Sequence, residues 1–133
     1  MKPIKALFVC VGNAARSQMA EGFLRQLGED RFRVSSAGLM PHWRVDPQTV
    51  AVMREVGVDI SGQRPKGLDK VDVMDQDVVI TLCAVSDDIC PSGFRGEVRH
   101  WNLEDPHDKP LEVYRAMRDE IRARVEELVG EVN

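Results

Sequence analysis

The sequence has no apolar segment long enough to cross a membrane. Its apolar runs fall well short of the roughly 20 residues that a bilayer-spanning helix needs, and the start of the chain, Met1 to Lys5, has no signal-peptide core or cleavage site. The chain has only three cysteines, an odd number that does not indicate a framework of structural disulfides. We therefore expect a cytoplasmic protein whose cysteines are reduced, reactive thiols.

Length and charge limit the number of domains and the kinds of partner that we expect. A chain of 133 residues is long enough for one domain with its own core, and 43% hydrophobic with 30% charged residues is ordinary for a globular protein. The net charge of -4 argues against nucleic acid as the main partner. We expect a single domain over residues 1–133 that is a monomer and binds neither nucleic acid nor membrane.

Apolar runs alternate with helical patterns along the chain, which indicates βαβ units and a parallel sheet. The runs predict strands at about 4–10, 32–37, 77–82 and 97–101, and the helical patterns predict helices at about 16–28, 47–56, 68–72 and 110–130. We expect an α/β fold, a single-domain three-layer sandwich with a four-stranded parallel sheet flanked by helices. Ligands of such sheets bind beyond the carboxyl ends of the strands. Cys10, Cys83 and the segment after Trp101 should therefore meet at one edge.

The most informative motif lies between the first predicted strand and the first predicted helix. It reads Cys10, Val11, Gly12, Asn13, Ala14, Ala15, Arg16 and Ser17. Backbone N–H groups of a tight turn before a helix bind a tetrahedral oxyanion, and Arg16 can hold two of its oxygens. The same field favours the thiolate of Cys10, to which Ser17 can donate a hydrogen bond. The motif predicts a nucleophile directed at phosphorus or arsenic; the alternative is an inert cysteine at a strand end.

Cys83 and Cys90 form a second group, at the end of the third predicted strand. Three thiols are what a relay of thiol–disulfide exchange requires: a nucleophile, a resolving thiol and a third that carries the disulfide outward. Two unrelated buried cysteines are one alternative. A zinc site is another, although the usual C-x(2–4)-C spacing and four ligands are missing, and the three histidines have no ligand spacing with these cysteines.

Two carboxylates follow the fourth predicted strand. Displacement at an oxyanion needs a proton for the leaving oxygen, and a carboxylic acid near the loop can supply it. Asp105 is the better candidate than Glu104, because the proline after it favours an extended, short-armed geometry. The alternative for Asp105 is a turn residue or a helix N-cap.

The chain resembles a known family, the thioredoxin-coupled arsenate reductases, which share the fold of low-molecular-weight tyrosine phosphatases. The resemblance rests on Val9 to Phe23, Ser35 to Gly38, Asp59 to Ser61, Val79 to Cys83 with Cys90-Pro91, and Trp101 to Pro106. It implies an arsenate reductase that serves arsenical resistance, with phosphate and sulfate as competing oxyanions, thioredoxin as the reductant and no cofactor.

The resemblance also implies a role for each residue. Cys10 attacks arsenate bound by residues 11–17, and Asp105 protonates the departing hydroxyl. Cys83 then attacks the sulfur of Cys10 and arsenite leaves, after which Cys90 attacks Cys83 and thioredoxin reduces the Cys83–Cys90 disulfide. Bridged Cα atoms must lie within roughly 7 Å of each other, so segment 83–96 should rearrange between redox states.

One departure from the family concerns a cation. Some members bind potassium through residues that correspond to Asn13, Glu21 and Ser36, together with an aspartate in the loop after Asp59-Ile60-Ser61. Here that loop, residues 62–66, contains no acid. We therefore expect no metal site, with Arg64 or Lys66 in that volume, and we expect Asn13 to support the motif by hydrogen bonds.

Two other functions remain open from the residues. A tyrosine phosphatase would use the same loop and acid, but it has no use for Cys83 and Cys90, and the aromatic residues that usually follow its Asp-Pro are replaced by residues 107–109. A redox sensor or oxyanion-binding regulator would explain the thiols but not the complete catalytic set. His42 is expected to be a surface or structural residue on the rim, and Trp43 with Arg44 part of a partner surface.

Overall fold

The computed structural model describes residues 2–83 and 89–132. The elements in chain order are β1 (Ile4–Cys10), α1 (Arg16–Gly28), η1 (Glu29–Arg31), β2 (Phe32–Gly38), α2 (Pro47–Arg54), η2 (Leu68–Lys70), η3 (Val73–Asp75), β3 (Val78–Thr81), β4 (Glu97–His100) and α3 (Leu111–Gly130). The elements labelled η are short 3₁₀ helices. The predicted strands and helices are confirmed to within two residues at each end, whereas η1 and η3 were not expected.

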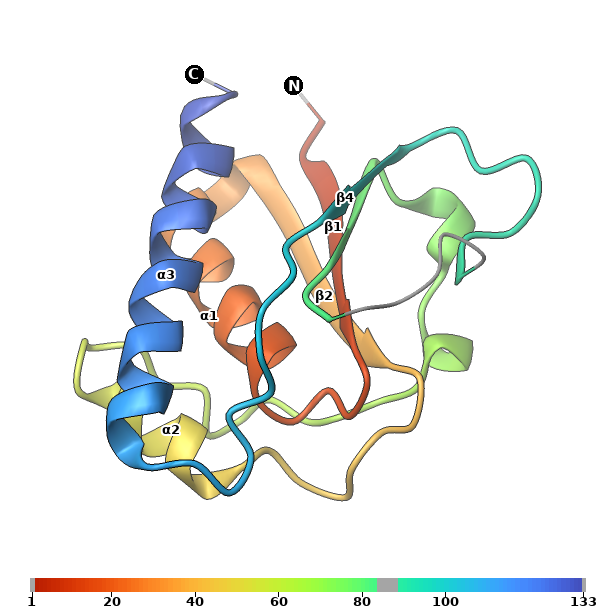
Figure 1. Cartoon of the computed structure of the whole chain (residues 1–133). Coiled ribbons are helices and arrows are strands. Elements are labelled where there is room, and N and C mark those ends of the chain that lie inside the picture. Colours follow the sequence, from red (N-terminus) through yellow and green to blue (C-terminus); the bar gives the residue numbers. More distant parts are fainter. Residues whose placement is uncertain (1, 84–88, 133) are drawn as a thin grey trace.

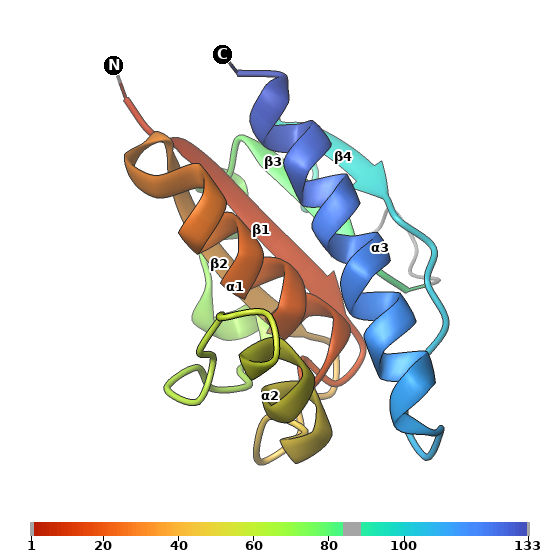
Figure 2. The same ribbon diagram turned by 90° about the vertical axis from the view of Figure 1, so that its left-hand side faces the viewer.

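The four strands form one parallel sheet in the order β2-β1-β3-β4. The register pairs Cys10 with Gly38 across β1 and β2, and Val9 with Thr81 across β1 and β3. Thr81 in turn pairs with His100 of β4. The carboxyl ends of all four strands therefore reach the same edge of the sheet, as Figure 2 shows for the central strand β1 and its neighbours.

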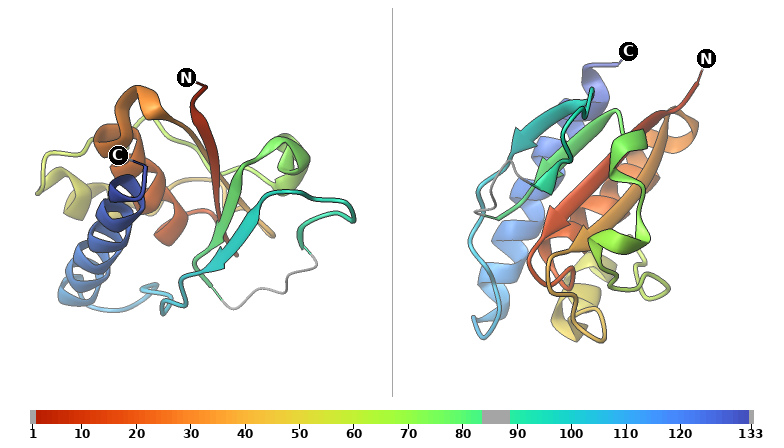
Figure 3. Two further views of the ribbon diagram at one scale, coloured as in Figure 1. Left: turned by 90° about the horizontal axis from the view of Figure 1, so that it is seen from above. Right: turned by 90° about the vertical axis from the view of Figure 1, so that its right-hand side faces the viewer.

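The helices α1 and α3 pack side by side on one face of the sheet, and α2 lies at their lower end (Figures 1 and 2). Alternate residues of β1 point to opposite faces, as the pleat of a strand requires. Phe8 belongs to the large core beneath the helices, and Leu7 and Val9 belong to a smaller core on the other face. That second face is covered by η2, η3 and segment 89–94 (Figure 3), so the outer layer on this side is thin.

Helix α3 carries the apolar stripe that its sequence predicts. The stripe residues that are buried in the large core are Tyr114, Met117, Ile121, Val125 and Leu128. Leu111, which was expected in the same stripe, is 37% exposed because it is the first residue of the helix and projects beyond the sheet. No helix in the described part of the chain is both long and apolar enough to span a bilayer.

Candidate active site

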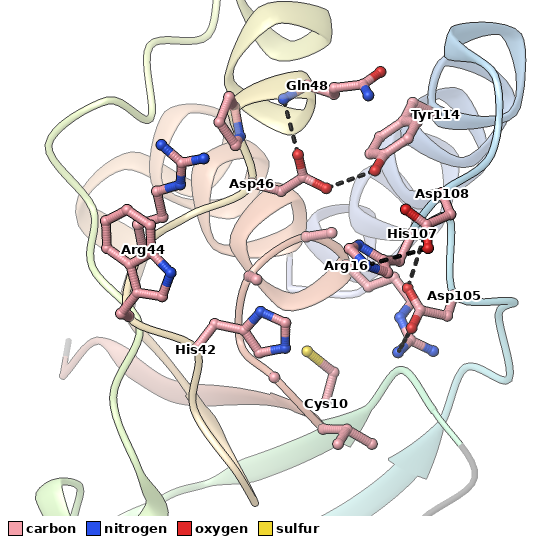
Figure 4. Close-up of a pocket in the computed structure, with 16 residues that line it drawn as sticks. Cys10, Arg16, His42, Arg44, Asp46, Gln48, Asp105, His107, Asp108 and Tyr114 are labelled. Atoms are coloured by element: carbon pink, nitrogen blue, oxygen red, sulfur yellow. Dashed lines mark hydrogen bonds and ion pairs between the residues drawn. The ribbon is translucent and has the colours of Figure 1, made fainter.

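A cavity of about 390 Å³ opens at the carboxyl edge of the sheet. Its floor is the turn between β1 and α1, residues 10–17, which we call the anion loop. The lining residues contributed by this loop are Cys10, Val11, Gly12, Ala14, Ala15 and Arg16. The wall opposite comes from the segment after β4, which contributes Asp105, and from the segment after β2, which contributes His42 (Figure 4). Three chain segments thus meet where the sheet topology predicts.

Cys10 lies at the base of this cavity with its side chain almost completely buried, at 2% exposure. Its sulfur accepts a hydrogen bond from the backbone N–H of Asn13 at 3.2 Å. The Ser17 hydroxyl lies 2.9 Å from the same sulfur. The sulfur therefore has one hydrogen-bond donor and one hydroxyl within contact distance at the base of the cavity, an arrangement that suits a nucleophile.

Asn13 and Ser17 belong to the anion loop and are two of the predicted substrate-binding residues, but they do not line the cavity. Asn13 is fully buried and has a φ of 51°, a left-handed conformation that asparagine tolerates better than most residues. Its side-chain amide donates to Ser17 Oγ at 2.7 Å and to Ser36 Oγ at 2.9 Å. Its Oδ1 accepts the backbone N–H of Lys66 at 2.9 Å. Asn13 therefore supports the loop by hydrogen bonds, as expected.

Arg16 begins α1, and its side chain is 8% exposed. Its Nη1 donates to the carbonyl oxygen of Leu103 at 2.9 Å and to that of Leu82 at 3.4 Å. These carbonyls belong to the segments that follow β4 and β3. The Arg16 Nη2 lies 4.0 Å from Asp105 Oδ2. The guanidinium is therefore fixed at one side of the cavity and joins the segments after β3 and β4 to the anion loop.

Asp105 lines the cavity and keeps a 63% exposed side chain. Its Oδ1 accepts the backbone N–H of His107 at 3.0 Å, which fixes the carboxyl group in a turn. Glu104, the other candidate acid, is 82% exposed, lies 3.9 Å from the ammonium group of Lys109 and does not line the cavity. The arrangement favours Asp105 over Glu104 as the proton donor.

Cys83 follows β3 directly and is 4% exposed. Its neighbour Leu82 donates its backbone N–H to the carbonyl oxygen of Val9, the residue before Cys10, at 2.9 Å. Burial raises the pKa of the Cys83 thiol, and the negative charge of the neighbouring Cys10 raises it further, whereas Arg16 and the backbone of Val11 act in the opposite direction. Cys10 and Cys83 therefore lie close enough to influence each other electrostatically.

Cys90, the third predicted thiol, is partly buried in the smaller core on the second face of the sheet. Residues 84–88, which connect Cys83 to this segment, lie outside the described residues. The expected rearrangement of segment 83–96 involves them and stays a prediction.

His42, expected as a surface or structural residue on the rim, is exposed and lines the active-site cavity. Its backbone N–H donates to the carbonyl oxygen of Gly12 at 2.9 Å. Its ring packs so closely on Gly12 that a Cβ built there would lie 2.5 Å from His42 Cδ2. Figure 4 shows the ring pointing into the cavity beside Cys10. The signal in the sequence was position: His42 follows a strand that ends at the ligand-binding edge.

Two further side chains of this region lie at the rim. Trp43 is 83% exposed, and the guanidinium carbon of Arg44 lies 4.5 Å from the centre of its ring. On the other side of the cavity, the Tyr114 hydroxyl donates to Asp46 Oδ2 at 2.5 Å. Asp46 also caps α2 by accepting the backbone N–H of Gln48. This contact ties α2 to α3 beside the cavity, and no local sequence pattern predicts it.

The anion loop, the buried Cys10 and the acid Asp105 line one cavity. A comparison with protein families identifies a phosphatase family. The family model described as low molecular weight phosphotyrosine protein phosphatase matches residues 5–133. The chain belongs to this family.

Within the low molecular weight phosphatase family, several similar proteins are arsenate reductases. The chain is 42% identical to the glutaredoxin arsenate reductase of Synechocystis over 130 residues, 97% of this chain and 98% of that protein. A solved arsenate reductase in the phosphate-binding state superposes with a TM-score of 0.87 at 41% identity, covering 98% and 99% of the two chains. A thioredoxin-dependent arsenate reductase of Corynebacterium glutamicum has a TM-score of 0.81 at 32% identity, covering 98% of this chain and 62% of that one.

The oxygens that would hold a potassium ion in some family members already have hydrogen-bond partners in this structure. Asn13 Oδ1 already accepts the Lys66 N–H, and the two carboxylate oxygens of Glu21 accept the Ser36 hydroxyl and the guanidinium of Arg25. Glu21 forms its ion pair with Arg25, and Arg64 and Lys66, which were expected in this volume, line the same cavity. Within residues 2–83 and 89–132, no group of three or more His, Cys, Asp or Glu side chains is arranged to hold a metal ion.

Proposed function

We propose that this protein reduces arsenate to arsenite through Cys10, Cys83 and Cys90, with a thioredoxin-class dithiol protein as the reductant. The observation that carries the proposal is the second buried thiol. Cys83 is 4% exposed, and its neighbour Leu82 donates its backbone N–H to the carbonyl oxygen of Val9, the residue before Cys10, at 2.9 Å. A phosphatase needs one thiol at this place, whereas a two-electron reduction needs two. The names of the similar proteins support the same activity.

The first step is a displacement at arsenic. The anion loop and Arg16 hold arsenate over Cys10, and the Cys10 thiolate forms a bond to arsenic(V). One hydroxyl of arsenate leaves as water and takes a proton from Asp105, whose carboxyl group lies at the mouth of the cavity. No electrons have been transferred at this stage, since the Cys10–arsenic adduct is still arsenic(V).

The second step transfers the electrons. The Cys83 thiolate attacks the sulfur of Cys10, so that an S–S bond forms and the S–As bond breaks with its electron pair going to arsenic. Arsenic(V) becomes arsenic(III) and leaves as arsenite, while two thiols become one disulfide. The backbone hydrogen bond from Leu82 to Val9 and the contact of Arg16 with the Leu82 carbonyl oxygen help to hold Cys83 beside the anion loop for this attack.

The third step restores the nucleophile. Cys90 attacks the sulfur of Cys83, which releases the Cys10 thiolate and leaves a Cys83–Cys90 disulfide for an external dithiol to reduce. Cys90 packs on the second face of the sheet, away from the helices α1 and α3. Its partial exposure suits a thiol that a protein reductant has to reach. The rearrangement that brings Cys90 to Cys83 is part of the proposal.

The reductant and the compartment follow from the same chemistry. One similar protein is named for glutaredoxin and another for thioredoxin. A disulfide carried within the chain is a substrate for a dithiol protein, which favours thioredoxin. Thiols of this kind persist in a reducing compartment, so we propose a cytoplasmic monomer that binds arsenate, with phosphate and sulfate as competitors, and neither membrane nor nucleic acid.

The test is arsenate-dependent oxidation of NADPH coupled through thioredoxin and thioredoxin reductase. We expect turnover by the wild type, and in Cys90→Ser we expect one stoichiometric reduction of arsenate without further turnover. Replacing the thioredoxin system by glutathione and glutaredoxin should give much slower turnover. Absence of arsenate reduction together with rapid hydrolysis of an aryl phosphate would contradict the proposal and identify a phosphatase.

A further inference from the structure

A buried carboxylate stands behind the anion loop. Glu21 is on α1 and is only 5% exposed. Its Oε1 accepts the Ser36 hydroxyl at 2.5 Å, and Ser36 Oγ in turn accepts the side-chain amide of Asn13 at 2.9 Å. The same amide donates to Ser17, whose hydroxyl lies 2.9 Å from Cys10 Sγ. An unbroken chain of hydrogen bonds therefore joins Glu21 to the nucleophilic sulfur.

A carboxylate at this depth requires a positive partner, because burying an unpaired charge is very unfavourable. Arg25, one helical turn after Glu21, supplies it: Nη2 lies 2.6 Å from Glu21 Oε2. The same nitrogen donates to the carbonyl oxygen of Val34 in β2 at 3.2 Å. The guanidinium is thus held by a side chain on its own helix and by the neighbouring strand.

We propose that Arg25 is a positioning residue whose guanidinium acts as a permanent internal cation for the anion loop. By neutralising Glu21 it keeps Ser36 and Asn13 oriented toward Ser17, so that the loop binds a tetrahedral oxyanion at full strength without a monovalent cation from solution. The inference rests on the anion loop of the proposed function and not on the thiol relay.

Two other cationic residues near Glu21, Arg64 and Lys66, do not neutralise its carboxylate. Glu21 and Arg25 open onto a second cavity, of about 670 Å³, which Arg64 and Lys66 also line. Within the described residues, neither Arg64 nor Lys66 forms an ion pair with Glu21. Lys66 reaches the network through its backbone N–H, which donates to Asn13 and so occupies an oxygen that a cation would need. Arg25 is therefore the side chain on which the neutralisation of Glu21 depends.

The experiment measures the affinity for inorganic phosphate by calorimetry, in potassium chloride and in choline chloride at equal ionic strength. For the wild type we expect the same Kd in both salts. Arg25→Met leaves the buried Glu21 carboxylate without a positive partner, so we expect a Kd that is roughly tenfold weaker. Arg25→Lys keeps the charge and should stay close to the wild type. Arg64→Met, in the same cavity, is the matched control and should change the Kd by less than about twofold.

A double variant separates the loss of charge from a loss of packing. Glu21→Gln with Arg25→Met removes both charges, so its phosphate affinity should recover toward the wild type, and it also covers the case in which Arg25→Met alone fails to fold. The inference is overturned if potassium strengthens phosphate binding by the wild type severalfold, or if Arg25→Met binds phosphate as the wild type does. Phosphate binding does not require Cys83, Cys90 or a reductant, so this outcome is distinct from a failure of the proposed reduction.

Discussion

Arg16 and Asp105 meet at the mouth of the active-site cavity, with Arg16 Nη2 and Asp105 Oδ2 4.0 Å apart. The two side chains differ in exposure, at 8% for Arg16 and 63% for Asp105. Arg16 is held by the carbonyl oxygen of Leu103, two residues before Asp105. An oxyanion on the loop would therefore meet a fixed cation on its inner side and a solvated acid on its outer side, which is where a leaving hydroxyl departs.

Replacing Asp105 by asparagine should impair the chemical step and leave binding intact. Asparagine keeps the oxygen that accepts the His107 N–H but has no proton to give to the leaving group. We expect kcat for arsenate to fall by about 10²–10³, within the usual contribution of a general acid. The phosphate Kd should change little. Steady-state kinetics in the thioredoxin-coupled assay, with calorimetry of phosphate binding, measure the two effects.

Glu104→Gln is the matched control for this variant, because Glu104 adjoins Asp105 but does not line the cavity. Its kcat should equal that of the wild type. If Glu104→Gln is the slower of the two variants, the acid has been assigned to the wrong carboxylate.

The resolving step should depend on pH through Cys83. Burial and the charge of Cys10 raise the pKa of the Cys83 thiol above its ordinary value, so that only a small fraction is thiolate near neutrality. Below that pKa the thiolate fraction rises about tenfold per pH unit, and only the thiolate attacks. In Cys90→Ser, the single-turnover rate of arsenite release at saturating arsenate should therefore increase from about pH 7 to pH 9. A rate independent of pH over this range would mean that the attack by Cys83 is not limiting.

The fold could be predicted from the sequence because its signals are local and repeated. The β-branched run before Cys83 forms β3, and the stripe of α3 is buried as its spacing requires. Asp46 followed by Pro47 begins α2, because an aspartate cap and a first-turn proline suit a helix N-terminus. The 3₁₀ helices η1 and η3 were missed, since three-residue turns leave no periodic pattern.

The site was only partly predictable, for a physical reason. The anion loop and Asp105 follow strand ends, and parallel strands place such residues at one edge. The pairing of Glu21 with Arg25 was missed because an i,i+4 ion pair on a helix is usually a solvated surface feature of little consequence. Here the strand β2 covers Glu21. The local sequence around Glu21 does not reveal that a distant segment will bury it.

Glu55 should make the stability depend on pH. It joins α2 to α3 by accepting hydrogen bonds from Arg115 and Arg118, and these lower the pKa of its carboxyl group from 4.5 to about 2. A lowered pKa in the folded state stabilises the fold above pH 4.5 and loses this effect as the pH falls through about 2. Glu55→Gln should therefore lower Tm at neutral pH, with a difference from the wild type that closes in acid.

Thermal unfolding followed by circular dichroism from neutral to acid pH checks this expectation. Glu120→Gln, which removes an exposed glutamate of α3, the helix that carries Arg115 and Arg118, is the control and should leave Tm nearly unchanged. A gap between Glu55→Gln and the wild type that stays constant down to low pH would contradict an electrostatic origin.

Gly38 should tolerate no side chain, because it ends β2 directly against the anion loop. A Cβ at this position would lie 2.7 Å from the carbonyl oxygen of Val11 and 3.0 Å from the backbone nitrogen of Asn13. These are backbone atoms, so the loop itself would have to move. We expect Gly38→Ala to lower the free energy of unfolding by about 1–3 kcal/mol, the usual cost of overpacking, and to weaken phosphate binding.

Alanine substitutions at two other glycines serve as comparisons for the stability of Gly38→Ala. A Cβ at Gly12 would meet the ring of His42, an exposed side chain that can rotate away, so Gly12→Ala should cost less stability than Gly38→Ala. A Cβ at Gly62 would have nothing within 4 Å, and Gly62→Ala should be nearly neutral. Urea unfolding of the three variants, with calorimetry of phosphate binding for Gly38→Ala, gives the order. If Gly38→Ala is as stable as Gly62→Ala and binds phosphate normally, the anion loop is not held rigidly against β2, and the close packing of its backbone does not contribute to oxyanion binding.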